Sequence, residues 1–282
     1  LSHIRTANYA HLIEAEALAD EATHGNRDWV EWEESDFDKD SVNELLVSGN
    51  AMNLYFDLAR GGAIFEWDWR AKKLNLTNTL ARRAEGYHRD LVEAAAQGAV
   101  EYPGAVKREK LASIHSTVVR AKEPGLEKLL NYDWYRRVGL IDHFIHPDSA
   151  LDDFARAQHA ELGDFVNQPY TSRVVETPHG LVITLARDGH IWQGAVFAPL
   201  RVEKKLTLRA GDYRLPITYT LRNTGAQTIT ARFGVEFCFA LLAGHSDDAY
   251  YRADGIARDD AHLDSRGEIA ARQIALVNAW LG

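Results

Sequence analysis

The sequence predicts a mainly β protein, in which a short helical segment precedes a large antiparallel β-sandwich. Two observations support this fold class. Short runs with alternating apolar and polar residues recur at close intervals, and glycine-containing turns separate them. Full helices do not alternate with these runs, as they would in a parallel α/β protein.

The chain opens with a predicted helix. Residues 5–22 carry apolar side chains at helical spacing, and Gly25 is a plausible stop. One helix cannot bury its apolar stripe alone, so we expect residues 1–27 to be the terminal helix of a helical bundle. The acidic residues that follow predict a solvated linker over residues 28–41, and a calcium loop is the alternative interpretation.

Residues 42–282 are expected to form the β-sandwich. Its first strands are predicted at 43–49, 51–59 and 63–70, whereas part of 79–97 has helical spacing. Later strands are predicted at 170–177, 181–188, 190–198, 201–210, 213–223 and 229–243. The pair Asp188-Gly189 is expected to be one of the turns between them.

Composition and charge exclude several classes of function. The 282 residues carry a net charge of −9, which argues against nucleic acid as a partner because a basic face is needed to neutralise phosphates. No apolar run approaches the roughly 20 residues that cross a bilayer, and no signal peptide is recognisable, so no membrane partner is expected. The single Cys238 fits a reducing compartment, and we expect a cytoplasmic protein.

The segment YDWYRRVGLIDHFIH, residues 132–146, has the composition of a binding site. Sugar rings stack on aromatic side chains, and their hydroxyls form hydrogen bonds with charged and amide groups. The predicted substrate-binding residues are Trp134, Tyr135, Arg136, Asp142, His143 and, in a later strand, Glu236. The alternative is structural: the aromatics form core, Arg136 pairs with a carboxylate and Asp142 caps a turn.

No catalytic residue, metal site or cofactor is predicted. The sequence lacks the GxSxG, P-loop, GxGxxG and HExxH signatures, and spacing selects no carboxylate pair for glycoside hydrolysis among the 41 acidic residues. His143 and His146 are three residues apart, so on a strand they point to opposite faces and cannot easily share a metal ion.

Several blocks of the chain resemble the C-terminal region of the family 57 α-amylases and 4-α-glucanotransferases. They are LSHIRTANYAHLIEAEALAD, GGAIFEWDW, NLTNTLARRAEGYH, YDWYRRVGLIDHFIH, ELGDFVNQPY, VEFCFALLAGH and HLDSRGEIAARQIALVNAWLG, in the expected order. This resemblance implies the end of the middle helical domain followed by a β-sandwich similar to the galactose-mutarotase-like supersandwich. Family members usually continue with more strands, so it also implies a sandwich truncated at its C-terminus.

The resemblance further implies an accessory role in an α-1,4-glucan-processing enzyme. The catalytic barrel of the parent polypeptide would precede residue 1, and this chain would support it, with α-glucan or a maltooligosaccharide as a further partner. We therefore expect no activity from this chain by itself. Two alternatives stay open: a mutarotase-like domain using His143 and Glu236 as acid and base, and a purely structural module.

Overall fold

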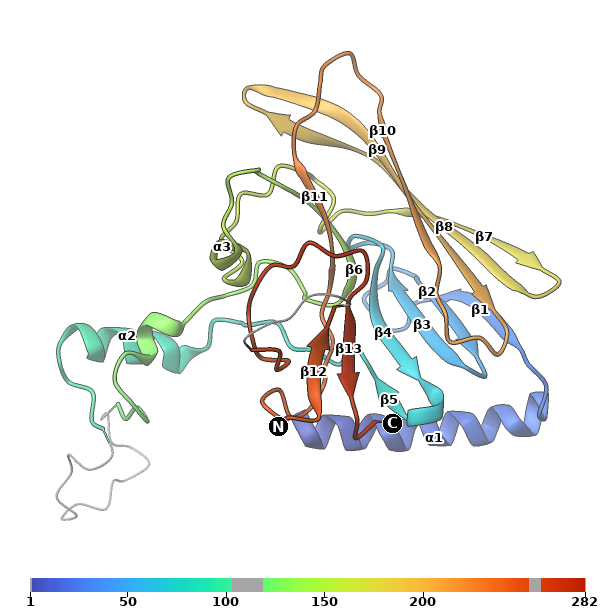
Figure 1. The fold of residues 1–282 in the computed structure, drawn as a ribbon, viewed down its shortest axis with the longest axis horizontal. Helices are drawn as coiled ribbons and strands as arrows, with labels where there is room; N and C mark the ends of the chain where they lie inside the picture. The colour runs from blue at the N-terminus through green and yellow to red at the C-terminus, as the bar shows by residue number, and fades with distance from the viewer. Residues whose placement is uncertain (1, 103–118, 254–259, 282) are drawn as a thin grey trace.

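The computed structural model describes residues 2–102, 119–253 and 260–281 (Figure 1). Within them the protein is mainly β, as the sequence predicts. The predicted first helix is present as α1 (Ser2–His24), and the helical spacing near residue 90 corresponds to α2 (Gly86–Ala96). Shorter helices are α3 (Leu151–Ala155), η1 (Arg70–Lys72) and η2 (Leu126–Leu129).

Antiparallel strands form a seven-stranded sheet in the described residues, with the order β1-β2-β3-β4-β6-β11 and with β5 beside β4. The bounds of these strands are β1 (Val30–Ser35), β2 (Glu44–Gly49), β3 (Met52–Asp57), β4 (Ala63–Trp69), β5 (Leu74–Asn75), β6 (Gly139–Ile145) and β11 (Arg232–Phe237). The strand β6 thus pairs with β11, although about ninety residues separate them in the chain. Non-local pairing of this kind brings the predicted residues His143 and Glu236 onto neighbouring strands.

A four-stranded sheet lies against the larger one, with the order β10-β9-β8-β7. Its strands are β7 (Thr171–Thr177), β8 (Gly180–Gln193), β9 (Val196–Arg209) and β10 (Ile217–Asn223). Figure 1 shows these yellow and orange strands above the blue strands β1–β3. A separate two-stranded antiparallel sheet of β12 (Ala249–Arg252) and β13 (Ala275–Asn278) completes the described strands.

The core of the sandwich lies between the two sheets. Apolar side chains from alternate positions of both sheets meet there, including Leu54 and Phe56 from β3 and Leu185 and Val202 from β8 and β9. Alternation explains the arrangement, because successive side chains of a strand point to opposite faces. We call the face of the seven-stranded sheet toward this core its inner face and the opposite face its outer face.

Two expectations about single segments are corrected. The strand β1 lies within the stretch expected to be an acidic linker over residues 28–41, and it pairs with β2 at the edge of the sheet. Its exposed Glu31 and Glu33 suit an edge strand, where charge discourages pairing with another chain. The assignment of α1 to a separate helical domain stays a prediction.

Asp188-Gly189 is not a turn, because β8 continues through it to Gln193 and the hairpin turns at Gly194. A Cβ at Gly189 would lie 2.7 Å from the Phe165 ring, so the glycine permits a close approach rather than a change of direction.

None of the helices in the described ranges is both long and apolar enough to cross a bilayer.

Candidate functional site

The strand β6 sends its neighbouring residues to opposite faces of the seven-stranded sheet. Leu140 and Phe144 join the core between the sheets, and Asp142 lies on the same inner face. His143 points to the outer face, where its neighbour two residues earlier, Ile141, belongs to a second apolar cluster. The predicted pair Asp142-His143 therefore belongs to two separate polar groups rather than to one site.

On the inner face, Asp142 is fully buried and accepts three hydrogen bonds. Tyr170 and Tyr219 each donate from a hydroxyl at 2.7 Å, and Nζ of Lys204 lies at 2.9 Å. The ammonium of Lys204 also donates to the carbonyl oxygens of Gly61 at 2.7 Å and Leu140 at 2.8 Å. Asp142 neither contacts solvent nor caps a turn, so its carboxylate is not accessible to a sugar.

On the outer face, the imidazole of His143 lies between two carboxylates. Its Nδ1 is 2.8 Å from Oε2 of Glu161, and its Nε2 is 3.1 Å from Oε2 of Glu236. Glu161 follows α3 and is tied to β6 by a hydrogen bond from the backbone N–H of Phe144 to Oε1 at 2.7 Å. Glu236 comes from β11, so three separate segments build this group.

These contacts fix the charges of the group. Burial raises the pKa of Glu161, but hydrogen bonding to His143 outweighs it, and the pKa falls to about 2. Burial likewise raises the pKa of Glu236, but His143 and the nearby Arg137 hold it below its ordinary value. Burial lowers the pKa of His143, yet the hydrogen bonds to both glutamates outweigh it and raise that pKa to about 9.

Aromatic and basic side chains enclose the His143 group. The ring of Tyr135 is buried and meets His143 edge to face, with 5.2 Å between centroids. Arg137 lies 3.8 Å from Oε1 of Glu236 and pairs with Asp133 at 3.0 Å. These contacts make Tyr135 part of the packing around the group and leave no open surface at its ring.

Two of the predicted residues remain at the surface. Trp134 is 46% exposed, and Arg136 is also exposed, with its guanidinium 5.3 Å from the ring centroid of Phe65. Asn167 donates from Nδ2 to the carbonyl oxygen of Trp134 at 3.2 Å, which helps to fix the backbone there. Trp134 and Arg136 both lie in the irregular stretch before β6, so only the second half of residues 132–146 is a strand.

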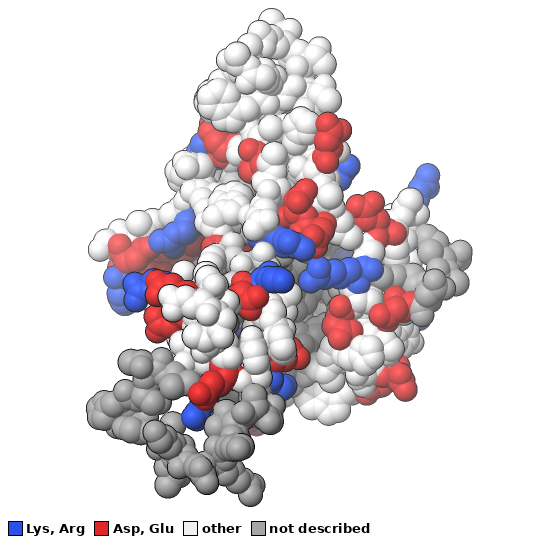
Figure 2. Space-filling model, turned by 90° about the vertical axis from the view of Figure 1, so that its left-hand side faces the viewer, with Lys and Arg blue, Asp and Glu red and all other residues white. Residues whose placement is uncertain are grey.

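Charges on the face shown in Figure 2 are interspersed. Lysine and arginine lie among aspartate and glutamate across the middle of this face, whereas its upper end carries few charged side chains. A polyanion-binding surface would instead gather basic residues into a patch or stripe. This face therefore offers no such patch.

Two groups in the described residues have the spacing of metal ligands. One consists of His143, His159 and Glu161, and the other of the acidic-loop residues Asp36, Asp38 and Asp40. The acidic loop was the alternative calcium site, but its carboxylates also accept backbone hydrogen bonds from their own loop. His146 lies beyond the end of β6 and is exposed, so it is not part of the His143 group.

Another polar group lies on the outer face beneath α1. Tyr9 of α1 donates from its hydroxyl to Glu66 at 3.4 Å, and Asn53 donates to Glu16 at 3.0 Å and to Asp68 at 3.3 Å. Burial, together with neighbouring carboxylates, raises the pKa of Glu66 to about 7 and that of Asp68 to about 8. The helix α1 covers these carboxyls.

Sequence reasoning missed three residues that complete the two groups on β6. Lys204 occupies an inward position between Val202 and Leu206 in the alternating strand β9, and that polar interruption was a visible signal. His159 and Glu161, the first residue of the ELGDF block, lie in a loop, where no periodic pattern indicates which side chains are buried.

Comparison with known proteins places these features in a family context. Residues 36–282 match the family model described as alpha-amylase/4-alpha-glucanotransferase, C-terminal. The chain is 31% identical over 277 residues to a 4-alpha-glucanotransferase of Thermococcus kodakarensis, covering 95% of this chain and 38% of that protein. It is 29% identical over 253 residues to alpha-amylase 1 of Dictyoglomus thermophilum, covering 89% of this chain and 33% of that protein.

The crystal structure of 4-alpha-glucanotransferase from Thermococcus litoralis is similar in fold. It superposes with a TM-score of 0.65 at 27% sequence identity, and the match covers 89% of this chain and 34% of that chain. The chain thus spans about a third of the length of the relatives it matches.

Proposed function

The chain belongs to the C-terminal domain family of the α-amylases and 4-α-glucanotransferases, and from this premise we propose that it is the non-catalytic accessory β-sandwich of an α-1,4-glucan-processing enzyme. In this role it supports a catalytic barrel in the same polypeptide and contributes an exposed aromatic contact for glucan. The observation that carries the proposal is the burial of the only predicted acid–base pair, His143 and Glu236, whose side chains are 1% and 7% exposed.

The charges of the His143 group also favour a non-catalytic role. Glycoside hydrolysis needs one carboxyl that stays protonated and donates to the leaving oxygen, which requires a raised pKa. Glu161 and Glu236 both have lowered pKa values, because each is hydrogen-bonded to His143. Neither can serve as that acid. The carboxyls with raised pKa values, Glu16, Glu66 and Asp68, lie on α1 or beneath it.

A mutarotase-like activity is the second function considered, since His143 and Glu236 are in direct contact at 3.1 Å. Acid–base catalysis requires that such groups reach a hydroxyl of the sugar ring. The burial of both side chains, with Tyr135 packed on the imidazole, argues against that reach. Polarimetry of glucose anomers tests it: we expect the uncatalysed rate, and acceleration that is lost in His143→Ala would favour the mutarotase activity instead.

Glucan contact is proposed for Trp134 and Arg136. An exposed indole offers the apolar face on which a glucose ring stacks, and the exposed guanidinium of Arg136, two residues further along the chain and over the Phe65 ring, can donate hydrogen bonds to hydroxyls. Tyr135, His143 and Glu236 support this surface from behind, because Tyr135 packs between Trp134 and His143.

Two measurements test the proposed function. The chain incubated with amylose, with and without a maltooligosaccharide acceptor, is expected to release no sugar and to transfer none. Titration with maltoheptaose, followed through tryptophan indole signals in NMR, is expected to shift the Trp134 signal, and Trp134→Ala is expected to abolish binding. Trp192→Ala is the matched control, because Trp192 is similarly exposed at 51% but lies in the four-stranded sheet.

Each measurement has a contrary result. Amylose cleavage above the buffer rate would contradict the non-catalytic role. Binding that survives Trp134→Ala, or is lost in Trp192→Ala, would move the glucan contact elsewhere. A cytoplasmic location is part of the proposal and is supported by the single Cys238, which has no second cysteine in this sequence with which to form a disulfide. Cell fractionation of the native protein tests that location.

A further inference from the structure

The imidazole of His159 is buried without a hydrogen-bond partner. Its side chain is 0% exposed, and neither Nδ1 nor Nε2 forms a hydrogen bond among the described residues. A buried polar group left unpaired costs on the order of 1–3 kcal/mol, so such a group in a folded protein needs an explanation. An alanine or phenylalanine in this position would avoid the cost.

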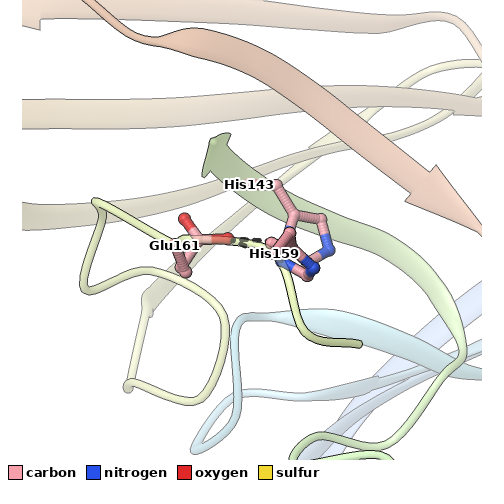
Figure 3. A group of neighbouring side chains, drawn as sticks. All are labelled: His143, His159 and Glu161. Atoms are coloured by element: carbon pink, nitrogen blue, oxygen red, sulfur yellow. Dashed lines mark hydrogen bonds and ion pairs between the residues drawn. The ribbon is translucent and has the colours of Figure 1, made fainter. Parts of the chain in front are cut away.

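Both histidines of the group are directed at one carboxylate oxygen. Oε2 of Glu161 lies 2.8 Å from Nδ1 of His143 and 3.5 Å from Nε2 of His159 (Figure 3). The three ligand atoms lie within 4.8 Å of one another. Tetrahedral zinc with bonds of about 2.0 Å sets its ligand atoms roughly 3.3 Å apart, so small side-chain movements bring these three atoms to that spacing.

Neighbouring groups orient two of the three ligands, His143 and Glu161, by hydrogen bonds, as is usual in metal-binding sites. A ligating histidine commonly donates its other ring N–H to a carboxylate, which fixes its tautomer and orientation. Glu236 is in position for this, with Oε2 3.1 Å from Nε2 of His143. Glu161 is fixed at its other oxygen by the backbone N–H groups of Phe144, at 2.7 Å, and Gly163, at 3.3 Å.

We propose that His143, His159 and Glu161 form a binding site for a divalent transition-metal ion of the zinc class. The ligand atoms are Nδ1 of His143, Nε2 of His159 and Oε2 of Glu161, a set of two imidazoles and one carboxylate that suits Zn²⁺. On binding, Nδ1 of His143 gives up its proton to solvent, and Nε2–H continues to donate to Glu236. The ion fixes the segment that carries His159 and Glu161 to strand β6.

The competing arrangement is a metal-free hydrogen-bonded cluster in which the proton of His143 bridges the two glutamates. It satisfies Glu161 and Glu236, but Nε2 of His159 keeps only a 3.5 Å contact with Glu161, and Nδ1 has no hydrogen bond among the described residues. A metal ion engages Nε2 of His159, which the metal-free cluster leaves with only a 3.5 Å contact to Glu161, and this is the reason for preferring the metal. Zn²⁺ binding at this site is measured separately from glucan binding and does not rest on the proposed function, although the Trp134 ring lies 6.2 Å from the ring of His159.

The test begins with the chain freed of metal by a chelator and titrated with Zn²⁺ in a calorimeter. We expect one tightly bound ion per chain, and the thermal midpoint should rise as the ion is added. His159→Gln should weaken Zn²⁺ binding by more than about 100-fold, since loss of a group that only hydrogen-bonds to a metal ligand already costs roughly 10–100-fold. Absence of stoichiometric Zn²⁺ binding to wild type would overturn the proposal.

A matched control separates this site from surface histidines. His245 is exposed, stacks on His262 at 4.2 Å and lies 3.1 Å from Asp264, so it offers an alternative surface site. His245→Gln should leave the tight Zn²⁺ site unchanged. Loss of the tight site in His245→Gln, with retention in His159→Gln, would overturn the assignment.

X-ray absorption of the zinc-loaded wild type decides the question even where His159→Gln fails to fold. The expected first shell has two imidazole nitrogens together with oxygen ligands, all at about 2.0–2.2 Å. A shell of oxygen alone, or with a single imidazole, would contradict the proposed ligand set.

Discussion

Asp142 and His143 are neighbours in one strand, yet they belong to opposite kinds of polar group. The inner group is complete: the carboxylate of Asp142 accepts from two tyrosines and from Lys204, and Lys204 uses its remaining protons on two backbone carbonyls. The outer group is incomplete, because neither ring nitrogen of the buried His159 forms a hydrogen bond in the described residues and Nε2 has only a 3.5 Å contact with Glu161. A satisfied network specifies the fold, whereas an unsatisfied one indicates a place for a ligand.

The inner group should respond most strongly to loss of a charge. Lys204→Met leaves the buried carboxylate of Asp142 without its cation, and breaking a buried pair in this way costs about 3–5 kcal/mol. Urea unfolding is expected to show this loss. Lys205→Met is the matched control, because Lys205 is exposed on the same strand and should change stability by less than about 0.5 kcal/mol. Equal midpoints for the two variants would contradict the role of the pair.

A smaller loss is expected from removing one hydroxyl of the inner group. Tyr219→Phe keeps the ring and deletes a 2.7 Å hydrogen bond to Asp142, and hydrogen bonds to charged groups contribute about 1.5–3 kcal/mol. The same change at the exposed Tyr213 should be nearly neutral. If Tyr219→Phe matched Tyr213→Phe in urea, the inner group would not be the closed network inferred from its contacts.

The outer group should respond in the opposite direction. In the presence of a chelator, His159→Phe replaces a buried imidazole that forms no hydrogen bond in the described residues by a somewhat larger apolar ring, and we expect a gain of about 1 kcal/mol. With Zn²⁺ added, wild type should gain thermal stability and the variant should not. A clear loss of stability in chelator would mean that His159 already has good partners without metal.

The carboxyls beneath α1 provide a pH-dependent comparison on the same outer face. Folded Glu66 and Asp68 keep their protons to about pH 7 and pH 8, whereas carboxyls of the unfolded chain lose theirs near pH 4. Between these limits the folded state binds more protons, so the contribution of the pair to the free energy of unfolding falls as pH rises.

Chemical denaturation at pH 5 and pH 8 checks this sign. Asp68→Asn mimics the protonated carboxyl, so it should remove much of the pH dependence and stabilise the protein relative to wild type at pH 8. Parallel pH profiles for wild type and Asp68→Asn would show that the carboxyl is not held protonated beneath α1.

The sequence predicted the fold class and the side of the sheet for several residues. Alternation in FGVEFCF indicated that Glu236 faces away from Val235 and Phe237, and in the structure those two pack on the core while Glu236 reaches His143. Alternation could not show that β8 continues through Asp188-Gly189. The glycine is there because the ring of Phe165, from another segment, lies too close for a side chain.

By itself the sequence determined the β-sandwich and the family, because alternation and family motifs are properties of contiguous residues. The tertiary structure alone decided which polar groups meet: Lys204 reaches Asp142 across the core, and a loop brings His159 and Glu161 to His143. Such encounters depend on strand order, register and loop packing, and these arise from contacts between segments far apart in the chain. Trp134 and Arg136 stay exposed although residues from other segments, His159 and Phe65, contact one side of each.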